Sequence, residues 1–145
     1  MAQAPSTFNS SARDTGQEVP FDLLELIYSR TDTRGVICAA NDTFDRLAGY
    51  GWRDTIGAPH KLVRHSDMPK GFFHIFWSLL KSGVPAVGYV KNRNKDGRYY
   101  WVLAAAIPCE GVFLGSTQAQ FGPVPNHPRR IRAPSAARAE RITVG

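Results

Sequence analysis

A dense group of polar side chains stands directly before the most aromatic segment of the chain. The segment reads KLVRHSDMPKGFFHIFW, residues 61–77, and its polar members are Arg64, His65, Ser66, Asp67 and Lys70. A guanidinium or an imidazole can bind phosphate or ribose oxygens, whereas a carboxylate ahead of a helix can accept hydrogen bonds from its first backbone N–H groups. The segment therefore indicates a helix start, the rim of a ligand pocket, or both.

Two asparagines also stand where an amide side chain can act. Asn41, in AANDTF, follows a β-prone run and precedes a helical pattern, so it is either a helix N-cap or a ligand-binding residue. Asn92, in VKNRNKDGRYYWV, falls inside a predicted strand, where asparagine is disfavoured unless its amide has a partner. Because alternate residues of a strand share a face, Val90 and Asn92 would point toward whatever that face covers.

The sequence lacks the patterns of common catalytic and metal sites. It has no glycine-rich phosphate loop and no nucleophile elbow, and neither its histidines nor its two cysteines show metal-ligand spacing with other plausible ligands. His65 and Asp67 form an acid–base pair on paper, but their i, i+2 spacing before a helix favours local capping. We therefore predict that the chain is not an enzyme.

The elements that must position these residues follow from turn and helix signals. ELIYSR and GVICAA are β-prone runs separated by TDTRG, which predicts a hairpin over residues 25–40. A short helix is predicted over NDTFDRLA, with Gly49 as its stop, and GWRDTIGAPHKLV is expected to hold one helical turn. Pro69 opens the longest predicted helix, which Gly83 ends.

Three further strands are predicted after this helix. VGYVKNRNKDGRYYWVLAAAIPC contains two strands joined near Asp96-Gly97, a strong hairpin signal, and GVFLGSTQAQFG supplies the last strand. Helices grouped between hairpin-linked strands predict an α+β fold with an antiparallel sheet. We expect one domain over residues 21–122, a flexible segment over residues 1–20, and a basic, disordered tail over residues 123–145.

The composition agrees with one small domain. The chain has 145 residues, of which 43% are hydrophobic, and it shows neither a signal-peptide pattern nor an apolar run long enough to span a bilayer. A cytoplasmic location with reduced cysteines is therefore expected. The formal net charge is +6, of which the tail carries +4. Since no aromatic residues interleave with its arginines for base stacking, we favour a solvated extension over contact with anionic lipid or a specific nucleic acid.

Four segments, in their order and spacing, resemble the sensory PAS domain of bacterial aerotaxis receptors. They are ANDTFDRLAGY, GAPHKLVRHSDMP, FFHIFWSLLKSG and YVKNRNKDGRYYWV, and the resemblance covers about residues 22–108. The patterns RH-x-DMP and VKNR-x-K-x-G-x-x-YWV are more specific than the general PAS pattern. The resemblance implies a five-stranded antiparallel sheet with short helices across one face. It also implies FAD held non-covalently between sheet and helices, with the redox state of the flavin as the signal.

The resemblance assigns roles to individual residues as well. It implies that the flavin is bound, or its cleft shaped, by Asn41, Arg64, His65, Asp67, Asn92, Tyr100 and Trp101. Where the family commonly carries a tryptophan in PW-x-G, this chain reads PAVG with Ala86, so one aromatic wall of the pocket is expected to be missing. The light-sensing flavin branch of PAS domains needs a reactive cysteine in an Asn-Cys sequence. Neither Cys38 nor Cys109 is so placed, so the resemblance does not extend to that branch.

The function that the resemblance implies is FAD-dependent sensing of redox state or oxygen, in aerotaxis-type signalling. The expected partner is a signalling protein or a receptor output domain outside this chain, and a PAS–PAS homodimer is a second expectation. Two alternatives remain open. One is a PAS module that binds no cofactor, or a small ligand, and works as an interaction surface. The other is a haem sensor with His65 or His74 as axial ligand.

Overall fold

The computed structural model describes residues 12–22, 24–110 and 112–119 of the chain. Its strands are β1 (Ile27–Asp32), β2 (Ile37–Ala40), β3 (Ala86–Arg93), β4 (Tyr99–Cys109) and β5 (Val112–Ala119). Its helices are α1 (Asp42–Ala48), α2 (Trp52–Thr55), the 3-10 helix η1 (His60–Val63) and α3 (Lys70–Lys81). This order confirms the predicted α+β fold, with both hairpins and the last strand in their expected places.

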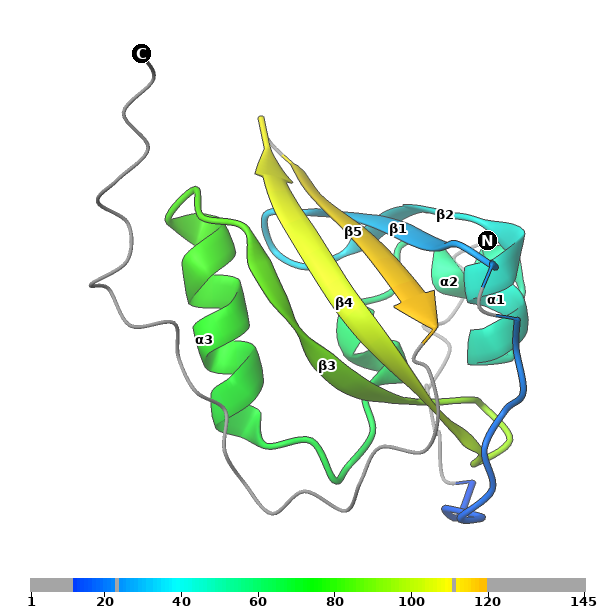
Figure 1. The fold of residues 1–145 in the computed structure, drawn as a ribbon. Coiled ribbons are helices and arrows are strands. Elements are labelled where there is room, and N and C mark those ends of the chain that lie inside the picture. The colour runs from blue at the N-terminus through cyan, green and yellow to red at the C-terminus, as the bar shows by residue number, and fades with distance from the viewer. Residues whose placement is uncertain (1–11, 23, 111, 120–145) are drawn as a thin grey trace, which may run out of the picture.

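The strands form one antiparallel sheet in the order β2-β1-β5-β4-β3 (Figure 1). The first hairpin supplies β1 and β2, the second supplies β3 and β4, and β5 enters between them. Side chains of α1, η1 and α3 pack with inward-facing residues of the sheet, so the helices cover one face. The other face of β3 and β4 carries the exposed side chains of Val87, Tyr89 and Ile107.

The first hairpin and α1 form for local reasons that the sequence displays. The Asp32 carboxylate accepts hydrogen bonds from the backbone N–H groups of Arg34 and Val36, both at 2.9 Å, and so closes the turn after β1. The Asn41 side chain caps α1 by accepting from the Phe44 N–H at 3.0 Å. Gly49 ends α1 in the left-handed conformation, with φ of 75°.

The segment between α1 and α3 differs from the prediction. One helical turn was expected over GWRDTIGAPHKLV, whereas the structure has two, α2 and η1. Gly57, with φ of 85°, breaks the chain direction between them, and Pro59 supplies the extended residue before η1. The second turn forms because it buries Val63 in the core.

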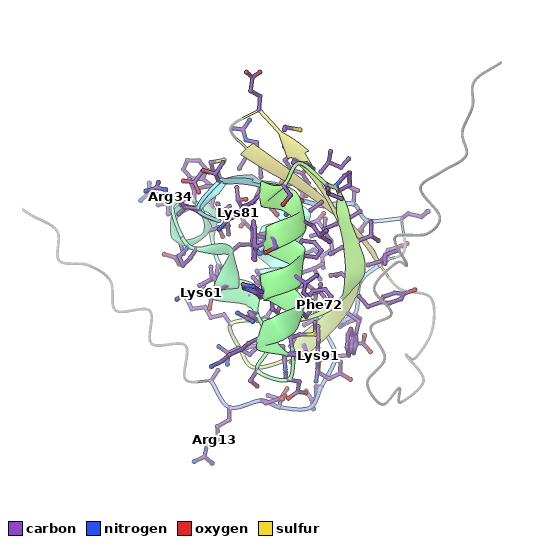
Figure 2. The ribbon with its side chains drawn as sticks, turned by 90° about the vertical axis from the view of Figure 1, so that its left-hand side faces the viewer. Arg13, Arg34, Lys61, Phe72, Lys81 and Lys91 are labelled. Carbon is purple, nitrogen blue, oxygen red and sulfur yellow. The ribbon has the colours of Figure 1, made fainter. Side chains whose placement is uncertain are left out.

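Helix α3 begins at Lys70, one residue after the predicted start at Pro69, and lies across the sheet (Figure 2). Asp67 does not cap it, because the N-cap residue is Pro69 and no side-chain cap hydrogen bond is present at this helix end. The Asp67 carboxylate instead accepts a hydrogen bond from Lys91 Nζ at 2.7 Å, which ties the segment before α3 to β3.

The N-terminal segment is more ordered than the sequence predicts. Residues 1–20 were expected to be flexible, yet Gln17 and Val19 pair with the start of β4. The Val19 N–H donates to the Tyr99 carbonyl at 2.7 Å, the Tyr99 N–H donates to the Gln17 carbonyl at 2.9 Å, and the Val19 side chain is buried. The predicted flexible residues 1–11 and the predicted tail, residues 123–145, lie outside the described residues.

Two apolar clusters hold the helices on the sheet. The larger joins α1, η1 and the sheet through fully buried side chains, among them Ile37, Leu47, Val63, Tyr100 and Val102. The smaller lies under the end of α3 and contains Leu80, Ala86 and Ala106. Among the helices of the described residues, none has the length and apolar character needed to cross a membrane.

Candidate functional site

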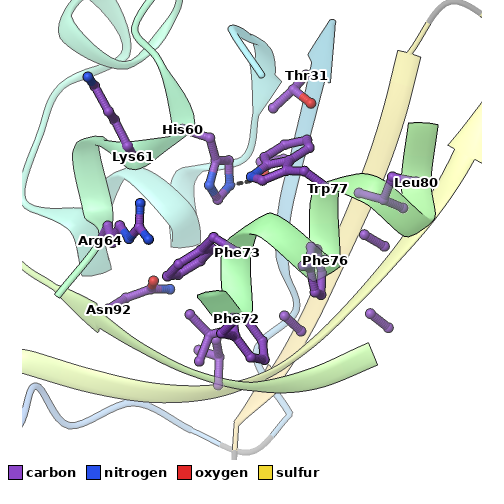
Figure 3. A pocket seen from close by; sticks show the side chains of 16 residues that line it. Thr31, His60, Lys61, Arg64, Phe72, Phe73, Phe76, Trp77, Leu80 and Asn92 are labelled. Atoms are coloured by element: carbon purple, nitrogen blue, oxygen red, sulfur yellow. Dashed lines mark hydrogen bonds between the residues drawn. The ribbon is translucent and has the colours of Figure 1, made fainter. Parts of the chain in front are cut away.

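A cavity of about 100 Å³ lies between α3, η1 and the inner face of the sheet (Figure 3). Most of its wall is apolar. Helix α3 contributes Phe72, Phe73, Phe76, Trp77 and Leu80, and the sheet contributes Val90, Val102, Ala104, Ala105 and Ala106. The polar lining residues are Ser29, Thr31, His60, Lys61, Arg64 and Asn92. A mostly apolar pocket with a few placed polar groups is the usual form of a small-molecule site.

The buried polar groups of the pocket come from β1 and β3. Asn92 is 8% exposed, and its amide offers both donors and an acceptor. Thr31 is 3% exposed, and its hydroxyl has no hydrogen-bond partner within the part of the chain that the structure describes. A buried hydroxyl without a partner is costly, so a ligand atom that bonded it would gain affinity.

His60 lies between the polar and the aromatic walls. Its Nε2 is 3.2 Å from Ser29 Oγ, and its ring packs against Phe44 and, edge on, against Trp77 at 6.5 Å between centroids. Burial lowers the pKa of His60 to about 4, because the imidazolium would lose its hydration there. The ring is therefore neutral at pH 7 and can both donate and accept one hydrogen bond.

The opening of the pocket is positively charged. Arg64 places its guanidinium carbon 3.9 Å from the centre of the Phe73 ring, and Lys61 stands beside it on η1 (Figure 3). The lining residues include these two cations and no carboxylate among the described side chains. A ligand with an anionic group outside an apolar, planar body would match this distribution.

Two of the seven predicted site residues, Arg64 and Asn92, line the pocket together. Their backbones form an isolated antiparallel bridge, which brings the segment after η1 against the end of β3. The pairing places a cation and a buried amide at the same end of the cavity. The sequence prediction had named both residues only because they belong to the motifs of the same family.

Asn41 lies outside the pocket and works as a helix cap. Its Oδ1 accepts from the backbone N–H groups of Tyr28 and Phe44, and its Nδ2 donates to the Leu26 carbonyl at 2.7 Å. The side-chain amide thus joins β1 to α1, with every bond made to backbone. Of the two interpretations that the sequence left open, the structure shows the N-cap.

His65 and Asp67 face away from the pocket, although Arg64 beside them faces into it. His65 is 1% exposed; its Nδ1 accepts from the Asp67 N–H at 3.1 Å, and its Nε2 lies 3.1 Å from the Asp14 carboxylate. Burial lowers the pKa of His65. The two residues therefore organise the loop before α3. Neither His65 nor the exposed His74, the axial ligands of the haem alternative, lines the cavity.

Tyr100 and Trp101 are adjacent strand residues and so point to opposite faces of β4. Tyr100 is fully buried, lies opposite Asn92 in the β3–β4 register and packs edge on against Phe21. Burial raises the pKa of the Tyr100 hydroxyl, and the neighbouring Asn92 side chain opposes that shift. Tyr100 therefore lies beside Asn92 on the inner face of the sheet, while Trp101 is half-buried beside Lys91 and outside the cavity.

The aromatic lining of the pocket comes from α3 and not from position 86. Ala86 is 1% exposed and packs in the small cluster with Leu80. The aromatic surface comes instead from α3, whose Phe72 and Phe76 rings stack at 5.7 Å between centroids. Helical spacing alone does not separate a core stripe from a pocket wall, so the sequence did not show that these phenylalanines line the cavity.

The sequence interpretation missed Thr31, His60 and Trp77 as pocket residues. Each comes from a different element, and only the tertiary arrangement brings them together. The lack of metal-ligand spacing around His60 gave the sequence no reason to place it in a site. A local signal at His60 is that it directly follows Pro59, whose fixed φ restricts the backbone at the start of η1.

Comparison with known proteins agrees with this architecture. Residues 37–111 match the family model described as PAS fold. The aerotaxis receptor of Escherichia coli (strain K12) is 46% identical over 103 residues, which cover 70% of this chain and 20% of the receptor. The chain thus corresponds to about a fifth of the length of that curated relative.

Solved structures with the same arrangement share less sequence. The light state of the blue-light photoreceptor Aureochrome1 LOV has a TM-score of 0.60 at 16% identity, covering 66% of this chain and 81% of that one. The PAS domain of a protein from Colwellia psychrerythraea has a TM-score of 0.60 at 21% identity, covering 66% of this chain and 86% of that one. At these identities the likeness establishes the fold alone.

Proposed function

The chain belongs to the PAS-fold family, and from that premise we propose that it is a sensory domain whose pocket under α3 binds FAD non-covalently. The observation that carries the proposal is the composition of the pocket. Its aromatic and aliphatic walls suit the flat ring of a flavin, and its cationic opening, Lys61 and Arg64, suits the phosphates. The 46% identity to an aerotaxis receptor supports sensing of redox state or oxygen as the purpose of binding.

The polar groups of the pocket fit the polar edge of a flavin ring. That edge carries carbonyl and imide groups, which need both donors and acceptors. Asn92 supplies both, and the Thr31 hydroxyl has no bond in the described structure that a ligand would have to break. His60 is neutral, but its Nε2 already lies at hydrogen-bond distance from Ser29 Oγ. These residues fit the cofactor in chemical type. The volume of about 100 Å³ is below the 300–1,000 Å³ that is usual for ligand pockets, so side chains of α3 would have to move.

A bound flavin supplies a change of charge and protonation when it is reduced. The chain would respond through Asn92, because a side-chain amide can exchange its donor and its acceptor by rotation. Asn92 lies opposite Tyr100 in β4 and is bridged to Arg64. A rotation of its amide would therefore change the contacts at the end of β3, in the segment before α3 and in the hydrophobic core.

The absorption spectrum of the purified protein tests the proposal. We expect a yellow protein with the two-banded visible spectrum of an oxidised flavin, or a colourless protein that acquires this spectrum after incubation with FAD. Chromatography of the extracted ligand would separate FAD from FMN and riboflavin. A protein that stays colourless in the presence of excess FAD would contradict the proposal, and a Soret band would identify haem instead.

Asn92→Ala tests the residue that we place at the ring edge. We expect it to weaken FAD binding by about tenfold or more, the equivalent of one lost hydrogen bond to a buried group. Tyr89→Ala is the control, because Tyr89 lies on the same strand but is 52% exposed on the outer face. Equal losses in the two variants would assign the effect to the strand and not to the amide.

A second candidate function is a PAS module that works as an interaction surface with no cofactor or with a smaller ligand. Two observations favour it: the small cavity volume and the exposed apolar side chains of Val87, Tyr89 and Ile107 on the outer face of the sheet. Because the chain spans about a fifth of the aerotaxis receptor, we propose that the output partner is a separate protein or a further domain. Self-association without any bound chromophore would favour this candidate.

A further inference from the structure

The part of the sheet beneath α3 is built from the two smallest residue types. In the β3–β4 register, Ala86 is opposite Ala106 and Gly88 is opposite Ala104. Strand alternation places all four on the face that α3 covers, and Ala86 and Ala106 are 1% and 7% exposed. We call these four residues the small-residue floor.

Large side chains of α3 fill the space above this floor. Phe72, Phe76 and Leu80 recur at i, i+4 and i+8 and so form one row on the helix. The Phe72 ring lies so close to β3 that a β-carbon placed on Gly88 would be 2.9 Å from two of its atoms. Phe72 therefore packs on the bare backbone of the strand, and a side chain at position 88 would have to displace its ring.

This contact limits the pocket. Figure 3 shows Phe72 and Phe76 in a row over β3 and β4, with Asn92 and Arg64 at the Phe72 end. A flat ring that reached the Asn92 amide and lay on the floor would occupy the space of the Phe72 ring. With Phe72 in that space, the cavity measures about 100 Å³.

We propose that Phe72 is the specificity-determining residue of this pocket: by occupying the floor above Gly88, it sets the largest ring system that the pocket admits. The inference rests on the proposed function for the identity of the ligand, but not for the steric effect. If the conformer with Phe72 on Gly88 is the main one, the apparent affinity for a large ring is reduced by the fraction of molecules in which Phe72 has moved away. Shortening the side chain removes that reduction.

The direction in which ligand affinity changes on shortening Phe72 separates a residue that occupies the ligand's place from one that forms a pocket wall. A side chain that forms the wall of a bound ligand lowers affinity when it is shortened, whereas one that occupies the ligand's place raises it. The variants are Phe72→Ala and, in case that substitution prevents folding, Phe72→Leu. Ile75→Ala is the matched control, since Ile75 lies on the same helix, is 53% exposed and does not line the cavity.

Each purified variant is titrated with FAD, followed by flavin fluorescence, and separately with indole, followed by calorimetry. A small apolar cavity created by truncation can bind a single aromatic ring, so indole reports on the space alone. We expect Phe72→Ala to bind FAD at least about tenfold more tightly than the wild type and to take up indole. The FAD affinity of Phe72→Leu should lie between those of Phe72→Ala and the wild type, and Ile75→Ala should match the wild type.

Weaker FAD binding by both Phe72 variants would overturn the inference, because Phe72 would then be a contact surface. If no variant binds FAD, the proposed function fails and indole decides the inference by itself. Uptake of indole by the Phe72 variants but not by Ile75→Ala would support it. Absence of uptake by all of them would overturn it.

Discussion

The side chain of Asn94 lies directly over Gly49, so close that a β-carbon at position 49 would stand 2.3 Å from Asn94 Oδ1. Asn94 is 4% exposed, and its Nδ2 donates to the Leu47 carbonyl at 2.8 Å, at the end of α1. The same amide accepts from the Asp96 N–H in the β3–β4 turn. One buried side chain therefore joins the end of the first helix to the second hairpin, and glycine at position 49 leaves room for it.

Gly49→Ala should destabilise the fold by about 2–4 kcal/mol. The new β-carbon has to displace the Asn94 amide, and alanine is strained at the φ of 75° that Gly49 adopts. Gly57→Ala is the control, because Gly57 has φ of 85° but no atom near its missing β-carbon. It should cost about 1–2 kcal/mol, from the backbone strain alone. Chemical denaturation measures the unfolding free energy of both variants. Equal losses would show that the Asn94 side chain moves aside at no cost.

Asn41→Ala should cost about 1–3 kcal/mol of unfolding free energy. The substitution removes the cap of α1 and leaves two backbone N–H groups and the Leu26 carbonyl without the bonds they have now. Asn41→Asp keeps an oxygen for the N–H groups of Tyr28 and Phe44 but sets a second acceptor against the Leu26 carbonyl, so it should retain only part of the stability that alanine loses. If the aspartate and alanine variants melt together, the bond to Leu26 is the important one.

Signals that lie within a few residues were readable from the sequence. The turn at Asp96-Gly97, the cap at Asn41 and the stop at Gly49 each depend on one residue type in one backbone conformation. The five-stranded arrangement followed from the resemblance and was confirmed in the described residues. The second turn, η1, escaped prediction because burial of Val63 decides it, and burial is a tertiary property.

The candidate site was only partly predictable for a similar reason. The RH-x-DMP motif gave no indication that Arg64 would face the pocket while His65 faced Asp14, because one residue of register decides the side. Thr31 and His60 reach the cavity from elements separated by α1 and α2. No local pattern could associate them. Arg64 and Asn92, by contrast, were both named as site residues, because both belong to the motifs that carry the family resemblance.

Acidification should destabilise the protein through His60 before it does so through carboxylates. The pKa of His60 is lowered from 6.5 to about 4 by burial, so between these values the unfolded chain binds the proton more strongly than the folded one. The contribution of neutral His60 to stability is therefore complete above pH 6.5. It is lost as the pH falls toward 4, which lowers the unfolding free energy by up to about 3 kcal/mol. Denaturation midpoints measured across this range would show the loss.

His60→Asn should flatten that pH dependence, because asparagine does not titrate. His65 also has a pKa lowered by burial and contributes with the same sign, so His65→Asn is needed as a second variant to divide the effect. Carboxylates whose pKa is lowered from values near 4, such as that of Asp14, lose their contribution only at lower pH. A pH dependence that persists in the double variant above pH 5 would exclude both histidines as its source.

Gly88 and Phe72 should be energetically coupled, because the ring rests where a side chain at position 88 would be. Gly88→Ala alone should cost about 1–3 kcal/mol, since the new methyl group displaces the ring. Phe72→Ala alone should cost about 2–3 kcal/mol, less than for a fully buried phenylalanine because Phe72 is half-buried. The double variant should be more stable than the sum of these losses predicts, by about 1–2 kcal/mol, because the methyl group then enters the space that the ring has left. Val87→Ala, on the exposed face of the same strand, should add to Phe72→Ala without coupling. Simple additivity of Gly88→Ala and Phe72→Ala would show that the ring does not rest on the floor in solution.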